Sequence, residues 1–98
     1  MMATFISTVQ FTEQGIANIH DTVKRTNAVK RSAKAMGVKV KDVYWTHGLA
    51  DGVIIFTADD DESATAFMLN IGSKMNVQTS TSRAFNAKEM GEILKKMP

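Results

Sequence analysis

The chain has 98 residues, of which 44% are hydrophobic and 22% are charged, and its formal net charge is +2. This length accommodates one domain, residues 1–98, and the composition is that of a folded globular protein. The absence of cysteine excludes a disulfide framework, thiolate metal sites and cysteine nucleophiles. The longest apolar run, residues 52–56, is too short to cross a bilayer, and the first residues do not have the form of a signal peptide. We therefore expect a cytoplasmic protein with no membrane partner.

The first elements expected along the chain are a strand and an interrupted helix. Residues 4–11 alternate in a way that is typical of a strand. Thr12 follows as a helix-capping residue, and residues 15–36 carry apolar side chains at helical spacing. That spacing changes phase near residues 20–22, so the sequence predicts a short helix and then a longer one that is capped by Asp21 or Thr22 and ends at Gly37.

A β-hairpin forms the predicted centre of the domain. Residues 38–47 and 53–58 are the next two strands, joined by a turn at residues 48–52. The second of these strands is continuously apolar, which is typical of a strand in the middle of a sheet that is buried on both faces. Tyr44 and Trp45 are adjacent, so one should point toward the helices and the other toward a dimer interface.

The remaining elements are a helix, a polar strand and a final helix. Four acidic residues at positions 59–62 open the helix, and we interpret them as capping residues favoured by the helix dipole, with a metal site as the alternative. The helix ends near Gly72. Residues 76–82 form a strand rich in Thr and Ser, which is expected at an edge of the sheet unless its hydroxyl groups line an interface. Asn86 caps the final helix.

The order β-α-β-β-α-β-α predicts an α+β, ferredoxin-like fold with a C-terminal helix. Such a chain forms a four-stranded antiparallel sheet with its first and third strands in the centre and both main helices on one face. The other face would be left bare, and an exposed apolar face of that size is unusual for a monomer. We therefore expect two copies to pair face to face as a dimeric α/β barrel, so the expected partner is the protein itself, as a homodimer or higher homo-oligomer.

Five basic residues gather on the longer part of the first helix: Lys24, Arg25, Lys30, Arg31 and Lys34. Such a cluster is usually a solvated helix face, whereas nucleic-acid sites interleave basic with aromatic side chains. Because no aromatic residue lies in this segment, we expect no nucleic-acid partner.

The predicted topology brings three connections to one end of the sheet, and with them His20, His47, Asp21 and Asp51. Two histidines and a carboxylate can ligate non-haem iron. Two strand spacings, about 10 Å, can separate the elements that carry the histidines, however, so we expect no metal and no cofactor. An acid–base role for His47 or His20 is the catalytic alternative, since histidine titrates near neutral pH.

Tyr44 and Trp45 either pack in the core or form the wall of an apolar pocket. The candidate ligand-binding residues are Tyr44, Trp45, His47, Asp51 and Arg83.

Segments along nearly the whole chain resemble the GYD domain family of small bacterial and archaeal proteins. The similar segments are residues 11–16, 43–46, 76–77, 83–85 and 92–96. The resemblance implies the dimeric α/β-barrel architecture. The Gly-x-Tyr-Asp turn of the family corresponds to Gly48, Leu49, Ala50 and Asp51, so alanine replaces the signature tyrosine and no role of its hydroxyl group is possible. The resemblance thus implies a fold rather than a reaction.

Three functions are consistent with these features. The first is a homo-oligomer that binds a small apolar or anionic molecule between the sheet and the helices. The second is an enzyme of the cofactorless monooxygenase or isomerase type, which the dimeric α/β barrel also hosts, with His47 or His20 as the base and Arg83 holding an anion. The third is a structural module whose fourth strand and final helix mediate assembly. A cavity of about 300 Å³ or more would favour the first two functions.

Overall fold

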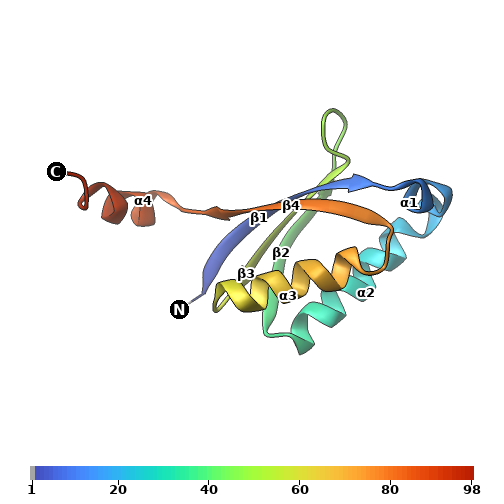
Figure 1. Cartoon of the computed structure of the whole chain (residues 1–98), viewed down its shortest axis with the longest axis horizontal. Coiled ribbons are helices and arrows are strands. Elements are labelled where there is room, and N and C mark those ends of the chain that lie inside the picture. Colours follow the sequence, from blue (N-terminus) through green and yellow to red (C-terminus); the bar gives the residue numbers. More distant parts are fainter. Residues whose placement is uncertain (1) are drawn as a thin grey trace.

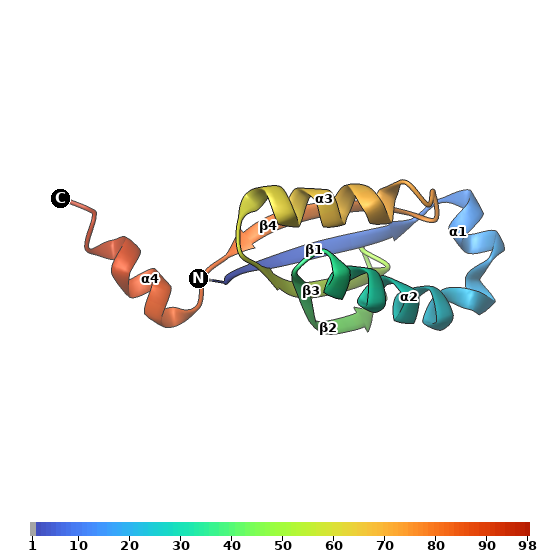
Figure 2. The same cartoon turned by 90° about the horizontal axis from the view of Figure 1, so that it is seen from below.

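The computed structural model describes residues 2–98 as a four-stranded sheet with two long helices on one face (Figures 1 and 2). In chain order, the elements are β1 (Ala3–Phe11), α1 (Glu13–Ala17), the 3-10 turn η1 (Ile19–Asp21), α2 (Thr22–Ala35), β2 (Val38–Trp45), β3 (Gly52–Ala58), α3 (Asp61–Gly72), β4 (Val77–Ala84) and α4 (Ala87–Leu94). This order confirms the predicted ferredoxin-like fold and the interruption of the first helix. Within residues 2–98, no helix has both the length and the apolar character needed to span a bilayer.

The sheet has the strand order β2-β3-β1-β4, and every pair is antiparallel. The first and third strands are therefore central, as predicted, and the polar strand β4 lies at an edge. The central place of β3 follows from its apolar residues on both faces. Ile54 and Phe56 are buried beneath the helices, and Val53 and Ile55 are half-buried on the opposite face.

Strand β2 ends two residues earlier than the sequence pattern indicates. The alternation extended to His47, whereas the strand ends at Trp45. The Thr46 N–H donates to the carbonyl oxygen of Asp51 at 2.9 Å, and the Thr46 hydroxyl donates to that of Ala50 at 2.6 Å. These bonds close the chain into a loop that contains His47 and projects away from the sheet in Figure 1.

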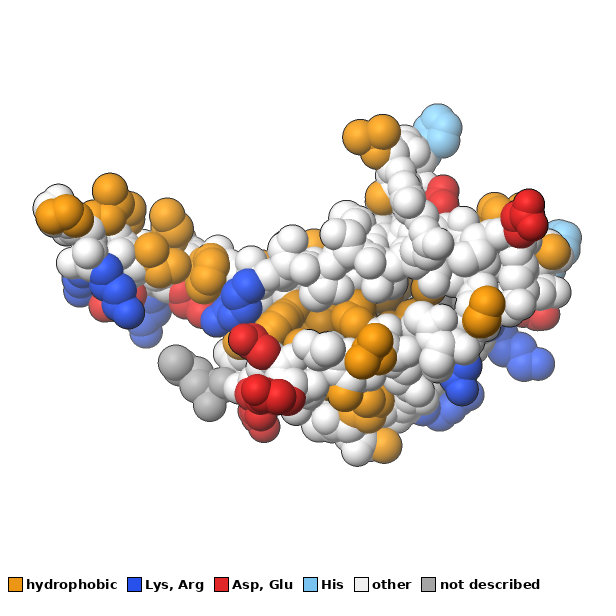
Figure 3. All heavy atoms as spheres, viewed as in Figure 1, with side chains coloured by type: hydrophobic (Ala, Val, Ile, Leu, Met, Phe, Trp, Pro, Cys, Tyr) orange, Lys and Arg blue, Asp and Glu red, His pale blue; other side chains and the backbone are white. Residues whose placement is uncertain are grey.

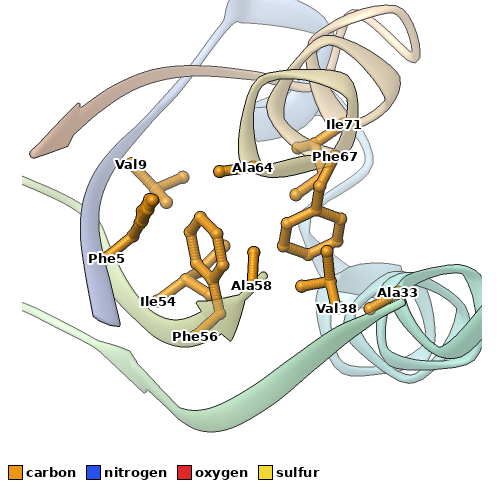
Figure 4. Packing of buried hydrophobic residues seen from close by; sticks show 10 residues of the cluster. All are labelled: Phe5, Val9, Ala33, Val38, Ile54, Phe56, Ala58, Ala64, Phe67 and Ile71. Carbon is orange, nitrogen blue, oxygen red and sulfur yellow. The ribbon is translucent and has the colours of Figure 1, made fainter. Parts of the chain in front are cut away.

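The hydrophobic core lies between the sheet and the helices α2 and α3 (Figure 4). The ring of Phe56 stacks against Phe5 with a centroid distance of 5.4 Å and meets Phe67 of α3 edge-on at 5.0 Å. Phe56 and Phe67 have no exposed surface, and Ala33 brings α2 into the same cluster. Burial of aromatic rings is the largest apolar contribution available to a domain of this size, and it holds both helices on one face.

The N-termini of α1, α3 and α4 are capped where the sequence predicts, whereas Asp21, which precedes α2, forms no side-chain capping bond. The Thr12 hydroxyl accepts a hydrogen bond from the Gly15 N–H at 3.1 Å, and the Asp60 carboxylate accepts one from the Ser63 N–H at 2.7 Å. Asn86 caps the N-terminus of α4 with a reciprocal capping box.

The bonds from Ser63 lower the pKa of Asp60. Because this pKa is lowered on folding, the cap stabilises the fold above the ordinary pKa of Asp and loses that effect as the pH falls through the lowered value.

The face of the sheet opposite the helices is uncovered. Ile6 and Tyr44 are exposed there, with Ile55 half-buried beside them. Helix α4 does not cover this face, because Figures 1 and 2 both place it beyond the end of the sheet. Its apolar residues Met90 and Leu94 are exposed as well. The domain therefore has two apolar surfaces outside its core.

Gly15 allows the connection after β1 to approach the segment before β4. A methyl group at this position would overlap the carbonyl oxygen of Asn76. The Thr12 N–H donates to the same oxygen at 3.1 Å, and the side-chain amide of Gln14 donates to the carbonyl oxygen of Lys74 at 3.0 Å. Helix α1 is thus fixed against the chain that joins α3 to β4.

Replacing Gly15 with alanine should lower the free energy of unfolding by about 2 kcal/mol, because backbone atoms must move to relieve the overlap. Urea denaturation followed by circular dichroism measures this change. Gly91→Ala is the matched control, since a methyl group on Gly91 in α4 would meet no atom. Its unfolding midpoint should be no lower than that of the unmodified protein, because alanine also favours the helix more than glycine does. Equal midpoints for the two variants would contradict the close approach at Gly15.

Candidate functional site

A cavity of about 320 Å³ lies between α2, the end of α3 and the sheet. Its apolar lining includes Val9, Val43 and Ile54 of the sheet, Val29 of α2 and Ile71 of α3. The volume is at the lower end of the range for small-molecule sites, about 300–1,000 Å³. The cavity reaches the size expected for ligand binding and suits a ligand that is small and mostly apolar.

Trp45 and Thr22 close one side of the cavity, between β2 and α2. The indole N–H of Trp45 donates to the hydroxyl oxygen of Thr22 at 3.0 Å. Trp45 therefore faces the helices, and the alternation of the strand turns the neighbouring Tyr44 side chain to the uncovered face. Trp45 and Tyr44 both border the cavity, because both belong to the end of β2 that forms its wall.

Asp51 lines the cavity and also fixes the hairpin loop. Its Oδ2 accepts a hydrogen bond from the Phe11 N–H at 2.8 Å, and its own N–H donates to the carbonyl oxygen of Val9 at 2.8 Å. In the same loop, Gly48 has a φ of 138°, a backbone conformation that favours glycine. The glycine and the aspartate of this turn thus both serve the geometry of the loop.

Arg25 lines the cavity, although the sequence pattern placed it in a solvated basic face. Its Nη1 donates to the carbonyl oxygen of Asn18 at 2.6 Å, and its Nη2 lies 3.5 Å from that of Gly15. The spacing of residues in the sequence does contain a signal that Arg25 faces the sheet. Arg25 precedes Val29 by four residues and Ala33 by eight, so it continues the apolar stripe of α2, unlike the other basic residues of the cluster.

The two histidines lie outside the cavity. His20 belongs to η1 and His47 to the hairpin loop, and both side chains are exposed. Figure 3 shows the histidine side chains in pale blue at separate points of the surface. Across residues 2–98, no three or more His, Asp or Glu side chains are grouped so that they could hold a metal ion. The fold therefore places neither histidine where it could act on a molecule in the cavity.

Arg83 lies in a second, more open groove of about 940 Å³ between α3 and β4. Figure 3 shows the hollow between these two elements, with apolar side chains on its floor. The guanidinium lies 5.5 Å from the ring centroid of Phe5 and 4.7 Å from that of Phe85, and it pairs with Glu89 at 3.7 Å. Arg83 is opposite Phe5 on β1, whereas the nearest cavity residue of that strand is Val9, roughly 13 Å along the strand. The structure therefore does not bring Arg83 together with Trp45 and Asp51.

Comparison with known proteins identifies the family and the fold. The model of the GYD domain matches residues 5–94. Among solved structures, one titled MtbAldR is similar, with a TM-score of 0.69 and 18% sequence identity, over 88% of this chain and 55% of that chain. This chain thus spans about half the length of that protein, and at this identity the likeness supports the fold alone. Comparison with curated proteins finds no match.

The region matched by the family model begins in β1 and ends in α4, so it includes every element that lines the cavity. It also includes the hairpin turn with Gly48 and Asp51. This match confirms the resemblance noted from the sequence segments. The chain belongs to the GYD domain family.

Proposed function

We propose that this protein is a homo-oligomer that binds a small, mostly apolar molecule in the cavity between α2 and the sheet. The observation that carries the proposal is the cavity, which has an apolar interior and a few polar groups at one end. This combination is the usual form of small-molecule sites, because apolar contacts supply affinity and a few polar groups fix orientation.

Loose packing throughout the domain would be an alternative origin of the cavity, but the rest of the core is filled. Phe56 and Phe67 are in ring contact and have no exposed surface. An apolar cavity costs stability because the side chains that line it lack neighbours on one side. A small apolar molecule restores those contacts, as ligands do in other apolar cavities. Ligand binding is favoured over catalysis because neither His20 nor His47 borders the cavity.

Replacing Ala28 with tryptophan should fill the cavity and weaken the binding of an apolar probe. Ala28 is an exposed residue of α2 that lines the cavity, so a larger side chain can enter without displacing the core. With toluene as the probe, the dissociation constant from an NMR shift titration should rise about tenfold, which corresponds to about 1.4 kcal/mol of binding free energy.

Ala35→Trp is the matched control, because Ala35 is exposed at the end of the same helix and does not line the cavity. This variant should bind toluene as tightly as the unmodified protein. If the unmodified protein does not bind toluene, or if both variants bind it equally well, the cavity is not the proposed site. Native mass spectrometry of the protein isolated from its own cells would identify a retained ligand and the oligomeric state together.

The proposed oligomer forms through the uncovered face of the sheet. Ile6 and Ile55 are register partners on the two central strands of this face, and Tyr44 extends the apolar surface toward the β2 edge. A second copy that covers these side chains would remove their apolar surface from water. Membership of the GYD family supports this arrangement, because the family resemblance implies the dimeric α/β barrel.

Replacing Ile6 with lysine should convert the oligomer to a monomer, because a charged group would be buried without a partner at the centre of the interface. Sedimentation velocity measures the change. Val23→Lys is the control, since Val23 is an exposed aliphatic residue of α2, on the helix side of the sheet. This variant should sediment as the unmodified protein does. A monomeric unmodified protein would refute the proposed interface.

A further inference from the structure

The cavity has an apolar interior and carries its charged residues toward one end, with a net charge of +1 among the described lining residues. Arg25 and Lys74 are its two basic lining residues, and Asp51 is its only acidic one. The Asp51 carboxylate already accepts the N–H of Phe11. The charges that face the cavity therefore favour a bound anion over a bound cation.

The two basic residues belong to the same end of the cavity, where β1 leaves the sheet. Arg25 contacts the carbonyl oxygen of Gly15, and Gly15 lies against Asn76. Lys74 is two residues before Asn76. The carbonyl oxygen of Lys74 accepts a hydrogen bond from the side-chain amide of Gln14. This network joins the start of α2, helix α1 and the end of α3 around one opening.

Arg25 is held in place by neutral groups and not by a countercharge. The carbonyl oxygens of Asn18 and Gly15 contact two nitrogens of its guanidinium, which has five N–H donors in all. Neither of the ion pairs formed among residues 2–98 includes Arg25 or Lys74. A half-buried, oriented cation without a countercharge is suited to an anionic ligand, because the side chain has already lost much of its freedom to move.

We propose that the ligand of this cavity is a small carboxylate with an apolar body. The carboxylate lies at Arg25 and Lys74, and the body lies among Val29, Val43 and Ile71. The inference rests on the proposed function of the cavity and specifies the class of molecule. A carboxylate fits because its two oxygens match the planar donor fork of arginine. The cavity volume of about 320 Å³ limits the body to a single aromatic ring or a short branched chain.

Three probes that share one aromatic ring test the inference: phenylacetate, its neutral isostere phenylacetamide, and the smaller toluene. Isothermal titration calorimetry at low ionic strength should give phenylacetate an affinity about tenfold higher than that of phenylacetamide, since hydrogen bonds to charged groups are stronger than those between neutral groups. Raising the salt concentration should lower the affinity for phenylacetate and leave the affinity for toluene unchanged, because salt screens the attraction of the charged probe only.

Arg25→Gln should reduce the preference for phenylacetate over phenylacetamide to less than about threefold, because the oriented charge is lost. Arg31→Gln is the matched control, since Arg31 is an exposed arginine of the same helix that does not line the cavity, and it should keep the full preference. Arg25→Lys is a second variant that keeps the charge and loses the fork. It should show an intermediate preference if Arg25→Gln proves too unstable to assay.

Equal affinities for phenylacetate and phenylacetamide, or an unchanged preference in both Arg25 variants, would overturn the assignment of a carboxylate. Toluene would still bind in that case, so the proposed cavity function would stand. If none of the three probes binds, the carboxylate inference and the proposed function both fail. Loss of the preference in Arg31→Gln would also count against a specific role of Arg25, because it would show that general helix charge is sufficient.

Discussion

The carboxylate of Asp51 fixes the end of the sheet on which the cavity depends. It accepts a hydrogen bond from the N–H of Phe11, the last residue of β1. The Asp51 N–H in turn donates to the carbonyl oxygen of Val9. A hydrogen bond to a charged acceptor is stronger than one between neutral groups, so this short loop is firmly attached to the central strand. The attachment positions the end of β2, and with it Trp45, whose indole reaches α2 and forms the side of the cavity.

The cavity forms where the helices present small or polar residues to the sheet. Around Phe56 the aromatic rings fill the space between the layers. Toward the other end of the sheet, the lining residues of α2 and α3 include the small or polar side chains of Thr26, Ala28, Ser32 and Asn70 beside Val29 and Ile71. Close backbone packing at Gly15 nevertheless holds the surrounding connections in place. The hollow is therefore bounded by rigid elements, which is the usual requirement for a binding site.

The two apolar surfaces outside the core meet the lining of the cavity at Tyr44. One is the sheet face around Ile6, and the other is the exposed side of α4, which joins the body near Arg83 and Glu89. An assembly module of strand β4 and the final helix would use the second of these surfaces, a face-to-face homodimer would use the first, and a ligand would use the opposite face of the sheet. Ligand binding and self-association are therefore compatible in this fold, although Tyr44 borders the cavity and also belongs to the uncovered face of the sheet.

The sequence by itself determined the order of elements, the central place of β3, the break before α2 and the caps at Thr12 and Asn86. These features are local, because they depend on the periodicity of side chains and on hydrogen bonds within a few residues. Trp45 and Asp51 could be named as cavity residues because they adjoin a predicted turn. Only the tertiary structure decided that Arg25 belongs to the cavity and Arg83 to a separate groove. The reason is that strand register and helix placement join residues far apart in the chain, and no local pattern specifies which ones meet.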